Sequence, residues 1–158
     1  MSAYLLDVNV LVALMWPKHE AHTLVHPWFA KHSKKGWATC PFTQAGFVRI
    51  VSNPAFSPHA VTPQEAIGIL RANCKQHFHH FWKDDIPVTD ALSLFQGRLA
   101  GHRQITDAYL LALAIYHDGM LATLDDSISA LVPLDSREHA RVELIREEPP
   151  NRLKTYSR

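Results

Sequence analysis

The chain has few cysteines and no excess of either charge. Cys40 and Cys74 lie far apart and belong to no CxxC pair, so neither a zinc site nor a disulfide framework is indicated. Lysine and arginine number 16, and aspartate and glutamate number 15. The net charge therefore does not indicate a nucleic-acid-binding protein, although a local basic patch beside an acidic metal site is compatible with it.

Long hydrophobic runs, internal repeats and low-complexity segments are also absent. The apolar N-terminal stretch contains Asp7 and Asn9, reaches Pro17 and has no basic leader, so it is too short and too polar for a membrane span. We therefore expect a soluble, unsecreted protein of the reducing cytoplasm. The 158 residues, 47% hydrophobic and 20% charged, predict one globular domain with a single core.

Apolar segments of strand length alternate with segments of helical periodicity. Strands are expected at residues 4–6, 37–40, 120–124 and 142–145, with a further short strand inside the irregular segment 77–87. Helices are expected as a turn after Asp7, from residue 21 to before Gly36, through 47–51 up to Asn53-Pro54, over 63–74, over 90–99 up to Gly101, and from Thr106-Asp107 to Gly119. The helix over 63–74 has the strongest start, because Thr62 and Glu65 form a capping box around Pro63.

This alternation predicts an α/β fold. The expected architecture is a three-layer sandwich, with a mostly parallel central sheet of about five strands and helices on both faces. Right-handed crossovers bring the C-terminal ends of the strands to one edge of the sheet. Ligands bind at that edge in such folds.

Three aspartates occur where apolar elements begin or end. Asp7 and Asp125 each follow an apolar run, and Asp107 opens a largely apolar helix. Burying an ionised carboxylate without a partner costs several kcal/mol, to an order of magnitude, and neighbouring carboxylates raise one another's pKa. Neither lysine nor arginine adjoins any of the three in sequence, so a cation from solution is the natural counter-charge.

A hard divalent cation fits such a carboxylate set. Mg²⁺ and Mn²⁺ prefer oxygen ligands and often bridge protein carboxylates to substrate phosphates. A metal-bound water of lowered pKa can then hydrolyse a phosphodiester without a covalent nucleophile. Taken singly, Asp7 could be a strand-end hydrogen-bond acceptor, Asp107 a partner of the helix dipole and Asp125 a turn former. Their joint pattern favours a metal site.

Four segments carry a resemblance to a known family: LLDVNVLVAL, CPFTQAGFVRIVSNP, ITDAYLLALA and LATLDD. In this order, across about residues 4–134, they resemble the PIN-domain family, specifically the VapC-type toxins of toxin-antitoxin pairs. The resemblance implies Mg²⁺- or Mn²⁺-dependent endoribonuclease activity on structured or translating RNA, and inhibition by an antitoxin encoded alongside. Residues 1–146 would form the PIN-like nuclease domain, and 147–158 a flexible C-terminal tail.

The resemblance also assigns roles to residues. It implies that Asp7, Asp107 and Asp125 are the first, third and fourth metal-binding acids, with Asn9 and Thr106 as polar supports and Arg49 on a helix that flanks the site. Where the family usually has glutamate as its second acid, this chain has Gln44.

Glutamine keeps a carbonyl oxygen but loses one negative charge. We therefore expect weaker metal binding, with one well-held ion and a second ion recruited with substrate phosphate. Asp126 is expected to be a solvated helix-capping neighbour of Ser127 and is left outside the main site. Arg49 could equally be an ordinary exposed cation.

Basic and aromatic residues supply candidate RNA contacts. The cations considered are Lys31, Lys34, Lys35, Arg49, Arg98 and Arg103; Lys34, Lys35, Arg98 and Arg103 are retained as candidate RNA-binding residues. The segment from His77 to Trp82 lacks the spacing of a metal site and is expected to be a solvated, partly aromatic loop, where Trp82 or His80 could stack on bases. Trp28 and Phe29 fit core or dimer contacts, and we expect a homodimer.

One other function remains open and a second is disfavoured. The chain could be a PIN-like RNA- or partner-binding domain that has lost catalytic activity through Gln44. A phosphatase with a DxD motif after its first strand is disfavoured, because Asp7-Val8-Asn9 lacks the second aspartate.

Overall fold

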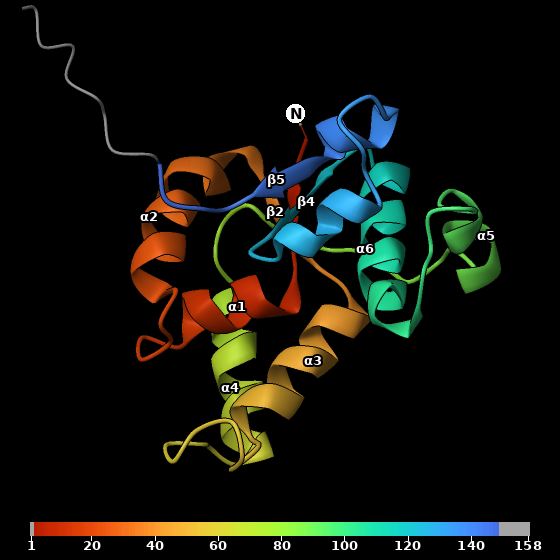
Figure 1. The fold of residues 1–158 in the computed structure, drawn as a ribbon. Helices are drawn as coiled ribbons and strands as arrows, with labels where there is room; N and C mark the ends of the chain where they lie inside the picture. The colour runs from red at the N-terminus through yellow and green to blue at the C-terminus, as the bar shows by residue number, and fades with distance from the viewer. Residues whose placement is uncertain (1, 149–158) are drawn as a thin grey trace, which may run out of the picture.

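The computed structural model describes residues 2–148. Within them the chain alternates strands and helices (Figure 1). The strands are β1 (Tyr4–Leu6), β2 (Trp37–Thr39), β3 (His79–Phe81), β4 (Met120–Thr123) and β5 (Val142–Leu144). The α-helices are α1 (Val8–Met15), α2 (His22–His32), α3 (Pro41–Val51), α4 (Pro63–Cys74), α5 (Val88–Ser93) and α6 (Ile105–Tyr116), and the 3-10 helices are η1 (Ser33–Lys35), η2 (His102–Gln104), η3 (Asp126–Ala130) and η4 (Arg137–Arg141).

The five strands form one sheet in the order β3-β2-β1-β4-β5, and every pairing is parallel. Leu5 of the central strand lies opposite Ala38 on one side and Leu121 on the other. The first two crossovers build the sheet outward from β1 in one direction, and the chain then returns to add β4 on the other side. The C-terminal ends of β1 and β4 therefore flank the point where the strand order reverses, which is where open α/β sheets bind ligands.

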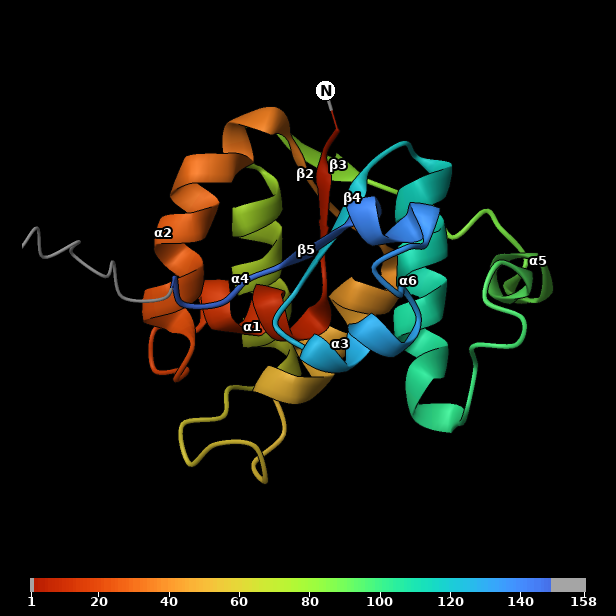
Figure 2. The same ribbon diagram turned by 45° about the horizontal axis from the view of Figure 1, so that its top comes forward.

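Helices cover both faces of this sheet, as predicted (Figure 2). On one face α6 and α5 pack on Leu5, Ala38 and Leu121. On the other face α1, α2, α3 and α4 pack on the alternate strand residues, such as Leu6 and Ala122. Successive strand residues point to opposite faces, so the two hydrophobic clusters account for the fully apolar strands. The expected three-layer sandwich is confirmed.

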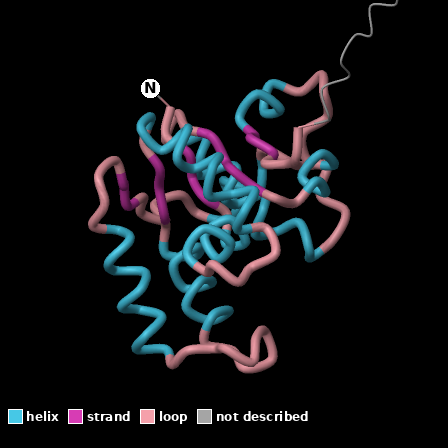
Figure 3. The backbone as a smooth tube through the Cα atoms, turned by 90° about the vertical axis from the view of Figure 1, so that its left-hand side faces the viewer, coloured by secondary structure: helices cyan, strands magenta, loops and turns pink. Residues whose placement is uncertain are grey.

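Local sequence explains where the helices begin. The side chain of Thr62 accepts the backbone N–H of Glu65, and Glu65 accepts the backbone N–H of Thr62 in return, so the predicted capping box starts α4. Figure 3 shows α4 joined to α3 by a connection that extends away from the sheet. A Cβ at Gly46 would come within 2.7 Å of Val8 Cγ2. This glycine therefore allows α3 to pack directly on the first turn of α1, beside the C-terminal end of β1.

Some predicted bounds were wrong. The helix expected over 90–99 is α5, which ends at Ser93; turns follow it up to Arg98 and include Gly97 at φ 88°. The last expected strand ends at Leu144, and η3 and η4 were not predicted. Most of the expected tail, residues 149–158, lies outside the described residues. Throughout the described 2–148 range, every helix is too short or too polar to cross a membrane.

Candidate functional site

Asp7 is the most buried carboxylate of the candidate site. It directly follows β1 and is only 7% exposed. Its Oδ1 accepts the backbone N–H of Val8 at 2.7 Å, so Asp7 caps α1, and its Oδ2 accepts the hydroxyl proton of Thr123 at 2.9 Å. Burial, and to a smaller degree the charge of Asp125, raises the pKa of Asp7 despite these hydrogen bonds.

Asp125 lies beyond the end of the neighbouring strand β4. Its backbone N–H donates to Thr123 Oγ1 at 3.1 Å, so the same hydroxyl oxygen connects the two aspartates. The side chain is exposed and caps η3 by accepting the backbone N–H of Ser127. The cap predicted for Asp126 was therefore wrong, because Asp125 makes it; Asp126 is exposed as the first residue of η3.

Asp107 approaches the other two aspartates from α6. Burial and the charges of Asp7 and Asp125 raise its pKa to about 6. The helix begins at Ile105, so Asp107 is in the first turn and Thr106, expected at the helix start, is an exposed residue within it. The charges of Asp7 and Asp125 both act on Asp107, so these carboxylates from three separate elements lie near one another.

Gln44 lies on the first turn of α3, at the C-terminal end of β2. Its Nε2 donates to Thr39 Oγ1 at 2.9 Å. Thr39 is fully buried, whereas Gln44 is half-buried. The side chain is held by Thr39, and its role at the position of the second acid stays a prediction.

The three aspartates fit a cation that retains water ligands. Nowhere in residues 2–148 does a group of three His, Cys, Asp or Glu side chains form a ready metal cage. The donor chemistry nevertheless suits a hard divalent ion, because all three groups are carboxylates and two have a raised pKa that a cation would lower. Mg²⁺ in proteins commonly uses one or two carboxylates and completes its coordination with waters and substrate phosphates.

A cavity of about 620 Å³ opens beside Asp125. Asn9, predicted as a polar support, lines it together with Arg146. Arg146 is exposed just after β5, the strand that pairs with β4, and the sequence analysis did not select it. Arg146 directly follows the last predicted strand, just as Asp7 and Asp125 each follow an apolar run. The same pattern could therefore have identified Arg146.

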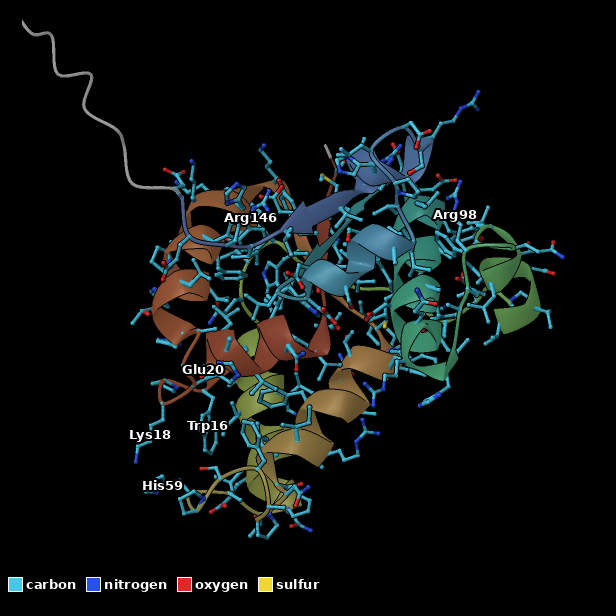
Figure 4. The ribbon with its side chains drawn as sticks, viewed as in Figure 1. Trp16, Lys18, Glu20, His59, Arg98 and Arg146 are labelled. Carbon is cyan, nitrogen blue, oxygen red and sulfur yellow. The ribbon has the colours of Figure 1, made fainter. Side chains whose placement is uncertain are left out.

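The basic residues predicted to bind RNA are scattered. Lys34 and Lys35 are exposed on η1, before β2, and so lie at the opposite edge of the sheet from the aspartates. Arg98 pairs with Glu138 at 3.3 Å and lies far from Arg146 (Figure 4). Arg103 is exposed on η2, immediately before the helix that carries Asp107.

Arg49 is exposed in the last turn of α3, at the far end of that helix from Gln44. Trp28 and Phe29 are half-buried and pack against the core. Of the two roles considered for them, core and dimer contacts, this is the core role.

The histidine-rich segment is more ordered than predicted. His79 is half-buried, and its Nε2 lies 2.8 Å from Thr39 Oγ1. Trp82 is only 8% exposed and stacks on His117 with ring centroids 4.4 Å apart. Stacking of Trp82 on RNA was therefore a wrong expectation, because the ring is in the core. His80 is exposed.

A second cavity, of about 450 Å³, adjoins the first. Both are lined by His19 and Glu20, and the second also includes Trp16, Lys18 and His59 (Figure 4). Because the two cavities share these two lining residues, they lie side by side.

Comparison with known proteins supports the fold and the family. The sequence profile of the PIN domain family matches residues 4–132. Ribonuclease VapC39 of Mycobacterium tuberculosis is 42% identical over 125 residues, which cover 79% of this chain and 90% of the relative. Ribonuclease VapC38 of the same species is 41% identical over 142 residues, which cover 89% and 96%.

The fold is also similar to a solved structure, VapBC2 from Rickettsia felis bound to a DNA fragment from their promoter. The TM-score is 0.58 at 12% identity, over 83% of this chain and 93% of that chain. At this identity the likeness concerns the fold alone.

Proposed function

Because this chain belongs to the PIN domain family and to its VapC-type ribonucleases, we propose that it is a Mg²⁺- or Mn²⁺-dependent endoribonuclease, the toxin of a toxin-antitoxin pair. The observation that carries the proposal is the convergence of Asp7, Asp107 and Asp125 at the reversal point of the sheet, where burial and like charge raise the pKa of Asp107 to about 6. Such a carboxylate set is suited to a divalent cation.

The aspartates would hold the cation in distinct ways. Asp7 is fixed by two hydrogen bonds, from Val8 and Thr123, and so provides a rigid ligand. Asp107 would give up its proton on metal binding, because its raised pKa makes the proton and the cation competitors near pH 6. A bound divalent ion supplies Lewis acidity and lowers the pKa of a water that attacks the phosphodiester.

The RNA would lie in the cavity beside Asp125. Arg146 is the arginine that lines this cavity, and an arginine can pair with a phosphate through two parallel N–H donors. We propose Arg146 as a phosphate contact; Lys34, Lys35 and Arg98 lie elsewhere.

Two protein partners belong to the proposal. Relatives at about 40% identity are named VapC ribonucleases, and the solved structure of similar fold is a VapBC pair. We therefore propose a cognate antitoxin as inhibitor, and a homodimer as the form of the toxin. We also propose that it acts on RNA in the cytoplasm.

RNA cleavage by the purified chain tests the activity. We expect Mn²⁺- or Mg²⁺-dependent cleavage that EDTA abolishes and that Asp7→Asn and Asp107→Asn each reduce by roughly 10²-fold or more. A non-catalytic RNA-binding domain would instead bind RNA and show no cleavage to abolish. In cells, expression should arrest growth, and Asp7→Asn should relieve the arrest.

A further inference from the structure

Gln44 is the first member of a partly buried hydrogen-bond chain. Its Nε2 donates to Thr39 Oγ1 at 2.9 Å, and the same oxygen lies 2.8 Å from His79 Nε2. Thr39 is fully buried at the end of β2, and His79 is on the neighbouring strand β3. Side chains from three elements, α3, β2 and β3, therefore meet at one hydroxyl group.

Thr39 Oγ1 can accept and donate at the same time. When it accepts the Gln44 N–H through one lone pair, it can donate its own proton to His79. In that arrangement His79 presents a lone pair on Nε2 and carries its proton on Nδ1. The Cys74 backbone raises the pKa of His79, which fits a proton on the ring nitrogen that does not face Thr39.

The surroundings of His79 favour a neutral ring. Burial and, to a smaller degree, the nearby His80 lower its pKa, although the Cys74 backbone opposes this effect.

The direction determines which end of Gln44 remains available. Since Nε2 is engaged by Thr39, the carbonyl Oε1 is the remaining polar atom; within the described residues it accepts no hydrogen bond and it is not buried. We propose that Thr39 and His79 are positioning residues, which fix the Gln44 amide so that its carbonyl oxygen serves the aspartate site. This inference rests on the proposed function for its catalytic consequence, but its geometry can be tested separately.

Glutamate in place of Gln44 would reverse the chain. A carboxylate cannot donate, so the side chain introduced by Gln44→Glu would accept the Thr39 hydroxyl proton, and Thr39 would then accept a proton from His79 Nε2. Gln44, Thr39 and His79 thus form a matched set, in which the neutral histidine suits the amide at position 44.

The tautomer of His79 tests this direction without any metal or RNA. We would record long-range ¹H–¹⁵N spectra of the metal-free protein above neutral pH, and assign His79 by the signal lost in His79→Gln. We expect the proton on Nδ1 in the wild type and a proton on Nε2 in Gln44→Glu. His80→Gln, at the exposed neighbouring position, should leave the His79 signals in place. A wild-type proton on Nε2, or an unchanged tautomer in Gln44→Glu, would overturn the proposal.

A matched pair at Thr39 tests the catalytic consequence. Thr39→Val keeps the shape of the side chain and removes the hydroxyl, whereas Thr39→Ser keeps the hydroxyl. We expect kcat for RNA cleavage to fall about 5- to 10-fold in Thr39→Val, as for the loss of one hydrogen bond, with KM nearly unchanged and Thr39→Ser close to wild type. Equal losses in both variants, or a change confined to KM, would refute the positioning role. If the wild type cuts no RNA, the proposed function and the catalytic role of Thr39 fall together, while the tautomer result still decides the geometry.

Discussion

Thr123 donates its hydroxyl proton to Asp7 Oδ2 across 2.9 Å. The hydroxyl oxygen of Thr123, Oγ1, also accepts the backbone N–H of Asp125 at 3.1 Å. Thr123 therefore fixes the relative positions of two site residues. Thr123 is only 1% exposed at the end of β4. The geometry of the carboxylates therefore depends on a buried hydroxyl group that would not itself touch a metal ion.

Replacing Thr123 should separate this role from simple packing. Thr123→Val removes the donor to Asp7, and we expect the free energy of unfolding to fall by about 1–2 kcal/mol. Mn²⁺ affinity should fall as well, because Asp7 loses a bond that orients it. Thr123→Ser should retain both properties. Urea unfolding and calorimetric titration measure them; wild-type Mn²⁺ affinity in Thr123→Val would show that the hydroxyl does not orient the site.

Asp107 should lower the stability of the metal-free protein at neutral pH. Its pKa is about 6 when folded, against 3.8 as the ordinary value, so the folded state holds a proton that the unfolded state releases. The contribution of Asp107 to the free energy of unfolding is therefore most favourable below about pH 4. It decreases as the pH rises to about 6 and stays unfavourable above that pH. Solvent screening reduces the penalty to the order of 1 kcal/mol.

Asp107→Asn should remove this penalty. Above pH 6 the metal-free variant should be more stable than the wild type by about 1 kcal/mol, although it loses RNA cleavage. The charge of Asp7 contributes to the raised pKa of Asp107, so the difference in stability between wild type and variant reports Asp107 together with its repulsion from Asp7. Thermal unfolding between pH 4 and pH 8 measures the effect, with Asp135→Asn at an exposed position as the control. A variant less stable than the wild type at pH 8 would contradict the repulsion between these carboxylates.

Local sequence patterns were enough to predict the sheet and two of its carboxylates. An apolar run that ends in aspartate identified both Asp7 and Asp125, because a strand buried on both faces delivers the next residue to the edge of the sheet. The start of α4 was also predictable, because the capping box involves only Thr62 and Glu65, which are close in sequence.

Features that depend on distant contacts were not predicted. The helix expected to reach residue 99 stops at Ser93, and Arg98 beyond it is held by Glu138 and the Leu131 carbonyl, which no local pattern encodes. His79 was placed in a solvated loop because its partner, Thr39, comes from another strand. In the same way, the side-chain contacts of Gln44 follow from the packing of α3 beside β2.

A carboxylate at position 44 should strengthen metal binding. Gln44→Glu adds a negative charge near the aspartates, and we expect the Kd for Mn²⁺ to fall about 5-fold, which corresponds to ~1 kcal/mol of added attraction at a partly solvated site. Calorimetric titration at pH 7.5 measures it. Gln64→Glu, at an exposed position of α4, adds the same charge away from the site and should leave the Kd unchanged. Equal Kd values for the two variants would show that position 44 does not face the ion.

Arg146 should contribute a phosphate contact that is independent of RNA sequence. We expect Arg146→Gln to weaken RNA binding to a similar extent for different sequences, and to reduce the slope of log K against log salt by about one. The measurement is best made with Asp107→Asn as the background, because this variant should bind RNA without cutting it. Fluorescence titrations at several salt concentrations give both the affinity and the slope.

Arg137→Gln is the matched control for Arg146→Gln. Arg137 is exposed on η4 and lines a different cavity, with Leu94 and Ile115, so its loss removes the same charge at a distance from the aspartates. If the two variants have the same salt slope, the loss of affinity reflects net charge alone and Arg146 makes no specific contact. If only Arg146→Gln changes the slope, the RNA backbone passes between Arg146 and Asp125, because these residues line the same cavity. The phosphate held there would then lie beside the carboxylates that bind the cation.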